Sequence, residues 1–336
     1  MRKEAVNIKN IGVILLNLGG PDSLEAVRPF LYNLFSDRKI IKLGPSFLQK
    51  PFAWMISGLR SRKTEQMYRL IGGKSPLLDI TLAQAAALKN SLNAPPGAHR
   101  PGPLFNVYVG MTYWHPFIED TVREMYGDDV ETALAVSLYP QYSIATSGSA
   151  LSKFTEAIRQ YPIESSIISQ WFDHPLYIEA LVDVIKKGLE SFHRDDAAVL
   201  FSAHSLPVSF IESGDPYAEH IRTTIEGVAT RIDIPWHLSY QSKTGPVKWL
   251  GPTTEEKILE LSLRGIKNLL VVPISFVSDH IETLYEIDIL YKRRARELGM
   301  RLERAESLNT HPLLIAALKD MILKSLNGLL PHEREA

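Results

Sequence analysis

A histidine stands at the end of an apolar run in the middle of the sequence. Residues 197–201 predict the interior of a buried strand, and the chain continues through His204 to Pro207. Because proline does not fit a strand interior, the strand is expected to end close to His204. Parallel α/β sheets bind their ligands at the carboxyl ends of their strands, so His204 is a candidate for chemistry. A histidine with a purely structural role at the strand end is the alternative.

A second group of titratable side chains follows another apolar run, at residues 269–274. Asp279, Glu282 and Glu286 are spaced three and four residues apart, so a regular helix would place them along one face. Adjacent carboxylates repel one another unless a cation or bound protons relieve the repulsion. A solvated helix face is the structural alternative. His280 lies within the row, however, and carboxylates with imidazole suit a divalent ion in transit, so a metal-handling site is predicted.

Strands and helices alternate along the chain and must bring these groups together. Such alternation predicts parallel sheets built from β-α-β units, here in two similar α/β halves divided near Ser149. The last helix is expected to pack back on the first half. Strands are expected at 11–18, 105–110 and 132–138 in the first half, and at 165–169, 197–201, 237–240 and 269–274 in the second. Helices are expected at 77–92, 117–126, 149–161, 177–193, 217–232, 254–263 and 311–326.

The composition argues against several classes of protein. The 336 residues allow about two domains, and 45% hydrophobic with 22% charged residues are typical of a globular protein. The net charge of −1 provides no basic field for nucleic acid. The sequence has no cysteine, which excludes disulfides, thiolate metal sites and iron–sulfur clusters. No apolar run is long enough to span a membrane, and residues 1–10 lack the apolar core of a secretory signal, so a cytoplasmic location is expected.

The segment at 43–59 interrupts the alternation, because it is apolar and aromatic and contains two prolines. Arg60, Arg62 and Lys63 follow it directly. One interpretation is an excursion of the chain that packs on the core. The other is an apolar lip that grips a flat hydrophobic ligand or rests on a membrane, with its basic residues toward lipid headgroups.

Two glycine-rich segments resemble nucleotide-binding motifs without matching them. Gly73-Lys74-Ser75 lacks the P-loop glycine five residues earlier, where Tyr68 stands. The segment at 18–21 follows a predicted strand, but it is not a dinucleotide-binding fingerprint. The Gly-x-Ser-x-Gly elbow of α/β-hydrolases is absent as well. Nucleotide binding and hydrolysis by these routes are therefore not supported.

Seven segments, in order along nearly the whole chain, resemble those of the ferrochelatases, which insert ferrous iron into a porphyrin. They are residues 17–21, 68 with 71–76, 138–143, 203–207, 240–246, 249–252 and 276–286. The resemblance implies an α/β fold of two similar Rossmann-like domains, each with a four-stranded parallel sheet flanked by helices, and a porphyrin cleft between them. Residues 1–148 with 308–336 would form the N-terminal half, and residues 149–307 the C-terminal half.

The resemblance also implies roles for individual residues. The catalytic pair would be His204 and Glu282. The acidic path with Asp279, His280 and Glu286 would lie on a helix that contains a π-type turn, which would alter the simple alignment of these side chains along one face. His204 is assigned as the base and Glu282 as its partner or iron ligand, and the reverse assignment fits equally well. Metal would be handled by His204, Glu282, Asp279, His280 and Glu286. Porphyrin contacts would come from Leu18, Tyr68, Ser75, Met111, Tyr113 and Trp249, and the lip from Phe47, Phe52, Trp54 and Arg60.

The expected reaction is insertion of ferrous iron into protoporphyrin IX, with iron as substrate and no tightly bound cofactor. The segment at 241–246 is closer to the protoporphyrin branch of the family than to the coproporphyrin branch. Residues 43–63 would contact the inner face of the membrane, and no nucleic acid is expected. This chain departs from the pattern of the family at two places. Many relatives have a large apolar or basic residue where Met111 and Thr112 stand. Some relatives also have a further carboxylate where this chain has Leu290. The alternatives are a coproporphyrin ferrochelatase, a cobalt chelatase and a non-catalytic porphyrin or haem carrier, which need not keep both His204 and Glu282.

Overall fold

The first of two parallel sheets is formed by strands from the first half of the chain. A computed structural model describes residues 10–94, 104–192, 197–245 and 247–327. The sheet has the order β2-β1-β3-β4, and all of its strands run parallel. Its strands are β1 (Asn10–Asn17), β2 (Leu104–Met111), β3 (Thr132–Ser137) and β4 (Glu164–Ile168). β1 and β3 are buried on both faces, as expected for central strands of a covered parallel sheet.

The second sheet repeats this arrangement with the order β6-β5-β7-β8. Its parallel strands are β5 (Ala197–His204), β6 (Trp236–Gln241), β7 (Asn268–Pro273) and β8 (Arg301–Arg304). The prediction of two similar four-stranded parallel sheets is confirmed. The assignment of strand 165–169 to the second half is wrong, because that segment pairs with β3 in the first sheet. The second sheet is instead completed by β8, which was not predicted.

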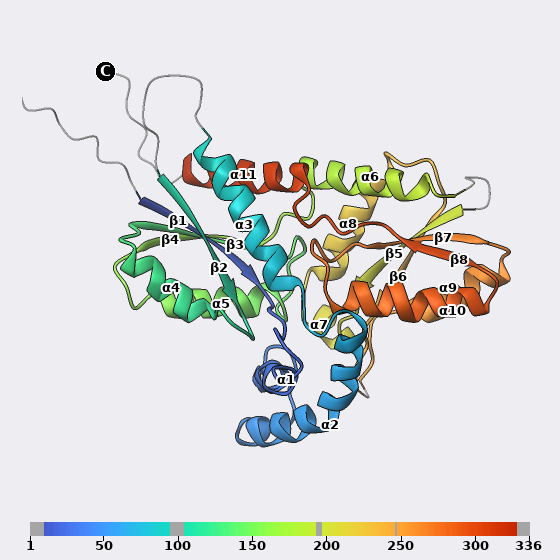
Figure 1. Cartoon of the computed structure of the whole chain (residues 1–336), viewed down its shortest axis with the longest axis horizontal. Helices are drawn as coiled ribbons and strands as arrows, with labels where there is room; N and C mark the ends of the chain where they lie inside the picture. The colour runs from blue at the N-terminus through green and yellow to red at the C-terminus, as the bar shows by residue number, and fades with distance from the viewer. Residues whose placement is uncertain (1–9, 95–103, 193–196, 246, 328–336) are drawn as a thin grey trace, which may run out of the picture.

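Helices cover both faces of each sheet (Figure 1). On one side lie α3 (Leu77–Asn93), α6 (Pro175–Leu189), α8 (Tyr217–Ala229) and α11 (Pro312–Asn327). On the other side lie α4 (Ile118–Gly127), α5 (Ser147–Ile158), α9 (Thr254–Leu263) and α10 (Lys292–Glu297). The short α7 (Val208–Glu212) follows β5, and a π-helix (Glu282–Tyr291) precedes α10.

One apolar core runs through both halves. It joins Val13 and Leu15 of β1 to Val199 and Phe201 of β5, by way of side chains from α6 and α11. Two smaller clusters lie on the opposite faces of the two sheets. The last helix contacts α3 and β4, as expected, and also α6. The two sheets are therefore joined by a shared core, and the division into domains at residues 148 and 307 stays a prediction.

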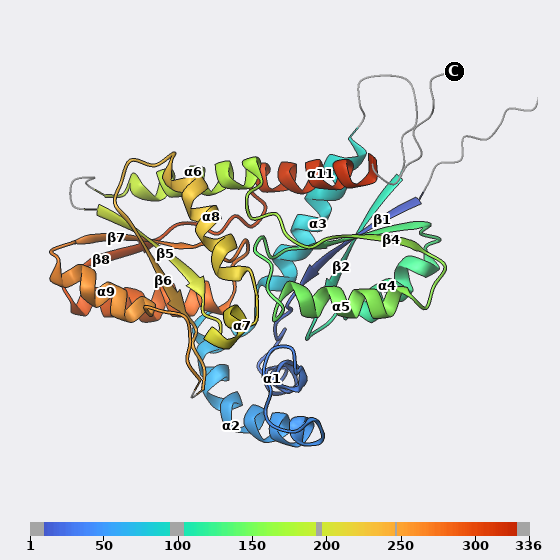
Figure 2. The ribbon, with the colours of Figure 1, turned by 180° about the vertical axis from the view of Figure 1, so that it is seen from behind.

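Two helices stand apart from the sheets, α1 (Val27–Ser36) and α2 (Gln49–Leu70), and they pack against each other (Figure 2). The buried amide of Gln49 joins them, since its nitrogen donates to the carbonyl oxygens of Phe35 and Ile41. Phe47, just before α2, is 76% exposed and Trp54 is 63% exposed. The segment therefore has parts that fit each interpretation: Ala53 is buried in a cluster with α1, whereas Phe47 and Trp54 project from it. Among the described residues, no helix is long and apolar enough to cross a membrane.

Candidate active site

A cavity of about 210 Å³ lies where the carboxyl ends of strands from both sheets come close together. The segments after β1, β3, β5 and β7 contribute to its wall, and α1 and the loop after it close one side. This is the edge at which parallel α/β sheets bind ligands. Its apolar wall includes Leu18, Leu34, Ile40, Leu77 and Leu138.

The polar wall of the cavity is built around His204 and Glu282. His204 ends β5, where its backbone N–H donates to the Ser275 hydroxyl and its carbonyl oxygen accepts from the Tyr217 hydroxyl. The Nδ1 atom of the imidazole lies 2.8 Å from Oε2 of Glu282. Glu282 opens the π-helix, which follows the neighbouring strand β7. The two predicted catalytic side chains are therefore joined, although 78 residues separate them in the sequence.

Each member of this pair stabilises the charged form of the other. Burial lowers the pKa of the His204 imidazole, but the negative charge of Glu282 outweighs burial and holds that pKa above its usual value. Burial likewise raises the pKa of Glu282, but the charge and the hydrogen bond of His204 outweigh burial and hold that pKa well below its usual range. Glu282 is thus a carboxylate at neutral pH, and Nε2 of His204 is the ring nitrogen left for a ligand.

Ser242 connects Glu282 to a second carboxyl group. Its hydroxyl oxygen lies 2.6 Å from Oε2 of Glu282 and 2.6 Å from Oε2 of Glu286. A hydroxyl donates only one hydrogen, so one of the two carboxyls must itself donate to the Ser242 oxygen. Burial and the nearby charge of Glu282 raise the pKa of Glu286 to about 7, which makes Glu286 the protonated member. A continuous hydrogen-bonded chain therefore runs from Glu286 through Ser242 and Glu282 to His204.

His280 presents a bare nitrogen close to Glu282. Its Nδ1 atom lies 3.1 Å from the carbonyl oxygen of Ser278, a contact that requires the proton to be on Nδ1. Burial lowers the pKa of His280, so the ring is neutral and Nε2 carries a lone pair. This buried Nε2 has no hydrogen-bond partner among the described residues, and it lies 3.9 Å from Oε1 of Glu282. An imidazole nitrogen and a carboxylate oxygen together suit a divalent transition metal.

Asp279 is committed to other contacts. Its Oδ1 atom accepts from Arg304, Ser307 and Thr283, and its Oδ2 atom accepts from Asn309. The expected row along one face of a regular helix is therefore wrong, because Asp279 precedes the helix and binds an arginine. The π-type turn is observed, from Glu282 to Tyr291. In the described ranges, no group of three or more His, Asp or Glu side chains has a geometry that could hold a metal ion.

The predicted porphyrin contacts divide into three sets. Leu18 and Trp249 line the cavity, and Trp249 is held there by a bridge between its backbone and that of Pro207. Tyr68 and Ser75 are buried and do not line the cavity. Both lie against Gly20, where a β-carbon would collide with the Ser75 side chain. A contact between any of these residues and a porphyrin stays a prediction.

Met111 and Tyr113 do not line this cavity. Met111 is fully buried in the shared core. Tyr113 directs its hydroxyl to Asp37, at 2.6 Å, and to Ser149, at 2.9 Å. The ammonium group of Lys153 lies 4.9 Å from the centre of the Tyr113 ring.

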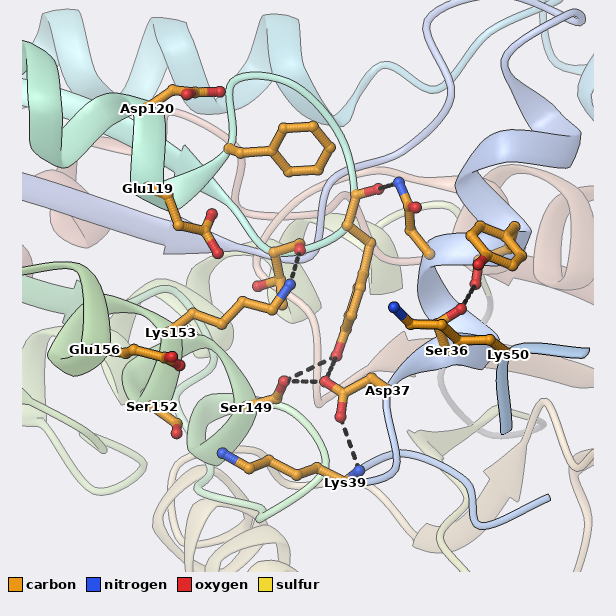
Figure 3. A pocket seen from close by; sticks show the side chains of 15 residues that line it. Ser36, Asp37, Lys39, Lys50, Glu119, Asp120, Ser149, Ser152, Lys153 and Glu156 are labelled. Atoms are coloured by element: carbon orange, nitrogen blue, oxygen red, sulfur yellow. Dashed lines mark hydrogen bonds between the residues drawn. The ribbon is translucent and has the colours of Figure 1, made fainter. Parts of the chain in front are cut away.

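These contacts belong to a second, charged pocket of about 630 Å³ between α1, α4 and α5 (Figure 3). Asp37 stands at its centre and also accepts from the backbone N–H of Lys39. Burial raises the pKa of Asp37, but the hydrogen bonds from Ser149 and Tyr113 outweigh burial and keep that pKa below its usual value. The Tyr113 hydroxyl is thus fixed by a carboxylate and is not available to a ligand in the first cavity.

The predicted lip residues lie outside the cavity wall. Phe47 and Trp54 are exposed, Phe52 is half-buried, and the guanidinium of Arg60 lies 5.5 Å from the centre of the Phe35 ring. The residues near the lip that do line the cavity are Leu34 of α1 and Ile40 of the loop after it.

Several residues at the site were not predicted as site residues. In the cavity wall, Tyr139 and Gln141 follow β3, and Ser275 and Phe276 follow β7. Ser242, which follows β6, lies behind the wall and contacts Glu282. Each comes directly after a strand, so the position of polar and aromatic residues just beyond strand ends was the available signal. The Phe276 ring lies edge-on to His280, 4.2 Å between ring centres, and so helps to fix that imidazole.

Comparison with known proteins gives one consistent family. The family model described as Ferrochelatase matches residues 10–326. The chain is 48% identical to a ferrochelatase of Desulfotalea psychrophila, over 94% of this chain and 97% of that protein. It is also 48% identical to a ferrochelatase of Synechocystis sp., over 94% of this chain and 83% of that protein.

Two solved structures share the fold at low sequence identity. SirB from Bacillus subtilis with Fe3+ aligns with a TM-score of 0.55 and 12% identity, over 94% of this chain and 95% of that one. The sirohydrochlorin chelatase SirB from Bacillus subtilis subspecies spizizenii, in complex with cobalt, aligns with a TM-score of 0.52 and 12% identity, over 97% and 98%. At this identity the likeness concerns the fold alone.

Proposed function

Since the chain belongs to the ferrochelatase family, whose members insert ferrous iron into a porphyrin, we propose that it acts on protoporphyrin IX through the His204–Glu282 pair. The observation that carries this assignment is the 2.8 Å contact between the two side chains at the wall of the cavity. It supplies a base and a carboxylate together, at the place where a macrocycle would meet both.

Metal insertion requires two changes in the porphyrin. A free porphyrin carries two N–H protons on a nearly flat ring, so both protons must leave as Fe2+ enters. The ring must also bend to turn a nitrogen lone pair outward, which costs on the order of 1–5 kcal/mol and is offset by binding elsewhere on the macrocycle. The apolar wall formed by Leu18, Leu138 and their neighbours is suited to holding the bent ring.

His204 is the proposed first proton acceptor. Its free Nε2 takes a pyrrole proton, and Glu282 stabilises the imidazolium that forms. The chain from Glu282 through Ser242 to Glu286 then offers a way for protons to leave the cavity. Glu286, whose pKa is raised to about 7, first releases its own proton to solvent and is then able to accept the next one through Ser242. In the reverse assignment Glu282 would be the base, but a carboxylate whose pKa is held low by the neighbouring His204 is a poor proton acceptor.

Glu282 and His280 are the proposed ligands for arriving iron. The bare Nε2 of His280 and Oε1 of Glu282 face each other across 3.9 Å. A pair of hard-to-borderline ligands binds Fe2+ without the strong retention of thiolates, which suits an ion that is a substrate. This chain has no cysteine with which to hold an iron–sulfur cluster.

Access to the cavity is proposed to involve the α1–α2 region. The cavity volume of about 210 Å³ is below the ~300–1,000 Å³ of typical ligand pockets, so Leu34 and Ile40 would have to move outward to admit a macrocycle. The exposed Phe47 and Trp54, near the basic cluster at 60–63, favour peripheral contact with an anionic membrane surface. An apolar porphyrin could then enter directly from the lipid.

The assignment is tested by anaerobic absorbance with ferrous or zinc ion and, in parallel, protoporphyrin and coproporphyrin. Wild type is expected to metallate protoporphyrin faster than coproporphyrin, and His204→Ala and Glu282→Ala to lose metallation. His237→Gln, on β6 and outside the cavity wall, is the matched control and should retain it. If wild type metallates coproporphyrin faster, the protein belongs to the coproporphyrin branch of the family. If wild type binds porphyrin but does not metallate it, the protein is a non-catalytic porphyrin carrier.

A further inference from the structure

A buried arginine lies beneath the π-helix and contacts it at two points. Arg304 ends β8, and its side chain is only 11% exposed. Its Nε and Nη2 atoms donate to the carboxylate of Asp288 over 2.9 to 3.1 Å, in a two-pronged contact. Its Nη1 atom donates to Oδ1 of Asp279 at 2.9 Å. Arginine is the side chain whose planar fork allows two such contacts at once.

The two partners of Arg304 bracket the proposed metal-handling residues. Asp279 lies three residues before the π-helix, and Asp288 lies within it. Between them in the sequence stand Glu282 and Glu286, the two carboxyls that meet at Ser242. The Arg304 guanidinium therefore links both ends of the segment 279–288, which carries these two carboxyls, to β8 at the edge of the second sheet.

Asp279 is itself anchored on the side away from the helix. Its backbone N–H donates to Oδ1 of Asn309, and the amide of Asn309 donates back to its Oδ2. Ser307 adds a hydrogen bond to Oδ1. Both carboxylate oxygens of Asp279 therefore accept hydrogen bonds from protein groups, which fixes the side chain in place beneath the π-helix.

A π-helix requires such support. Its i→i+5 bonding is rare and occurs mostly at functional sites, where other contacts stabilise it. A return to ordinary helical bonding would rotate the residues that follow Glu282 about the helix axis. Glu286 would then leave Ser242, and the paired arrangement of the two carboxyls would be lost.

We propose that Arg304 is a positioning residue for metal insertion: it holds the π-helix in the register that brings Glu282 and Glu286 together at Ser242, and Asp279 is its anchor rather than an iron ligand. The inference rests on the proposed function, because it takes Glu282 as the residue that receives iron.

The test separates metal handling from porphyrin binding. Arg304→Met is compared with wild type for zinc insertion, with the KM of the metal and the fluorescence-derived Kd of the porphyrin measured separately. The metal KM is expected to rise about tenfold or more, as for lost supporting contacts around metal ligands, with the porphyrin Kd unchanged within about twofold. Arg304→Lys should recover part of the loss, because lysine restores the charge but not the fork. Arg301→Met, on the same strand and half-exposed, is the matched control.

A double-mutant cycle decides the role of Asp279. If Asp279 acts through Arg304, Asp279→Asn combined with Arg304→Met will be no worse than the more severe single variant. If Asp279 binds iron itself, the two losses will multiply, and the anchor role is wrong. Hydrogen exchange followed by mass spectrometry should also show faster exchange confined to the peptide over 282–291 in Arg304→Met.

An unchanged metal KM in Arg304→Met, or a parallel loss of porphyrin binding with faster exchange throughout the chain, would overturn the proposal. Glu282→Ala in the same assay distinguishes this failure from that of the proposed function. If Glu282→Ala metallates as wild type does, the proposed site is wrong. If it is inactive while Arg304→Met keeps its metal KM, only the positioning role fails.

Discussion

The His204 imidazole and the Glu282 carboxylate share one hydrogen bond, so the titration of either depends on the other. A base must be neutral to accept a proton, and activity should therefore fall as the pH drops through the raised pKa of His204. The pH dependence of kcat/KM therefore shows how the His204–Glu282 pair titrates.

Glu282→Gln is predicted to move the acidic limb of the kcat/KM profile to lower pH. Removing the carboxylate charge removes the main influence that raises the His204 pKa, while burial, which lowers it, remains. The maximal rate should also fall, because iron loses a ligand. Zinc insertion measured from pH 5 to 9 provides the profile, with His237→Gln as control, and an acidic limb that stays in place would show that His204 is not the titrating base.

Glu286→Gln is predicted to stabilise the protein at high pH relative to wild type. The folded-state pKa of Glu286 is raised to about 7, so the folded protein holds a proton that the unfolded chain releases near its ordinary value of 4.5. Wild type therefore loses stability as the pH rises from about 4.5 to about 7, by a few kcal/mol at most, and glutamine removes this dependence. Thermal unfolding at pH 5 and pH 8 checks the sign. A difference in Tm between the variant and wild type that does not grow with pH would contradict a protonated Glu286.

Gly20→Ala is predicted to destabilise the packing of the segment after β1 against Ser75. A β-carbon at Gly20 would meet the Ser75 side chain, and overpacking of this kind costs about 1–3 kcal/mol. Gly127→Ala, at the end of α4 with open space around the position, is the matched control and should leave the Tm nearly unchanged. Equal effects of the two substitutions would show that the close approach at Gly20 is not constraining.

Most helices and strands could be predicted from the sequence, but the strand that each one pairs with could be predicted less well. Strands at β1, β2, β3, β5, β6 and β7 followed from apolar runs, because buried parallel strands are apolar on both faces. The four residues of β8 include three charged side chains and give no such signal. β4 was found, but its place in the first sheet depends on pairing with β3, which local pattern does not encode.

The candidate site was predictable to the extent that it follows from strand ends. His204 and Glu282 come after neighbouring strands, so the parallel topology brings them together. The contact of Asp279 with Arg304, 25 residues away, could not be read from carboxylate spacing that assumes a regular helix. The contact of the Tyr113 hydroxyl with Asp37, 76 residues earlier in the sequence, could not be predicted from local pattern either, and a contact of Tyr113 with a porphyrin stays a prediction.

At the scale of the whole molecule, the α1–α2 pair lies apart from both sheets (Figure 2). Several exposed apolar side chains gather along α2 and just before it: Phe47, Trp54, Met55, Leu59 and Leu70. The double substitution Phe47→Asp with Trp54→Asp is predicted to abolish sedimentation with vesicles rich in anionic lipid, because it replaces two inserting side chains with charges that the surface repels. Leu263→Asp, at an 81% exposed position on α9, is the control and should leave binding unchanged. Metallation of porphyrin in detergent should persist in all three proteins, and equal vesicle binding by all of them would argue against a membrane-facing lip.

His204 and Glu282 are expected to carry out metal insertion rather than merely to line a porphyrin pocket. A single-turnover experiment tests this expectation most directly: zinc is mixed with protein already saturated with protoporphyrin, and the absorbance of the metalloporphyrin is followed in wild type, His204→Gln and Glu282→Gln. Both variants are expected to insert zinc about 100-fold more slowly than wild type or slower still, with the Kd of protoporphyrin nearly unchanged. Insertion in both variants at the wild-type rate would contradict this expectation and would place the chemistry elsewhere in the cleft.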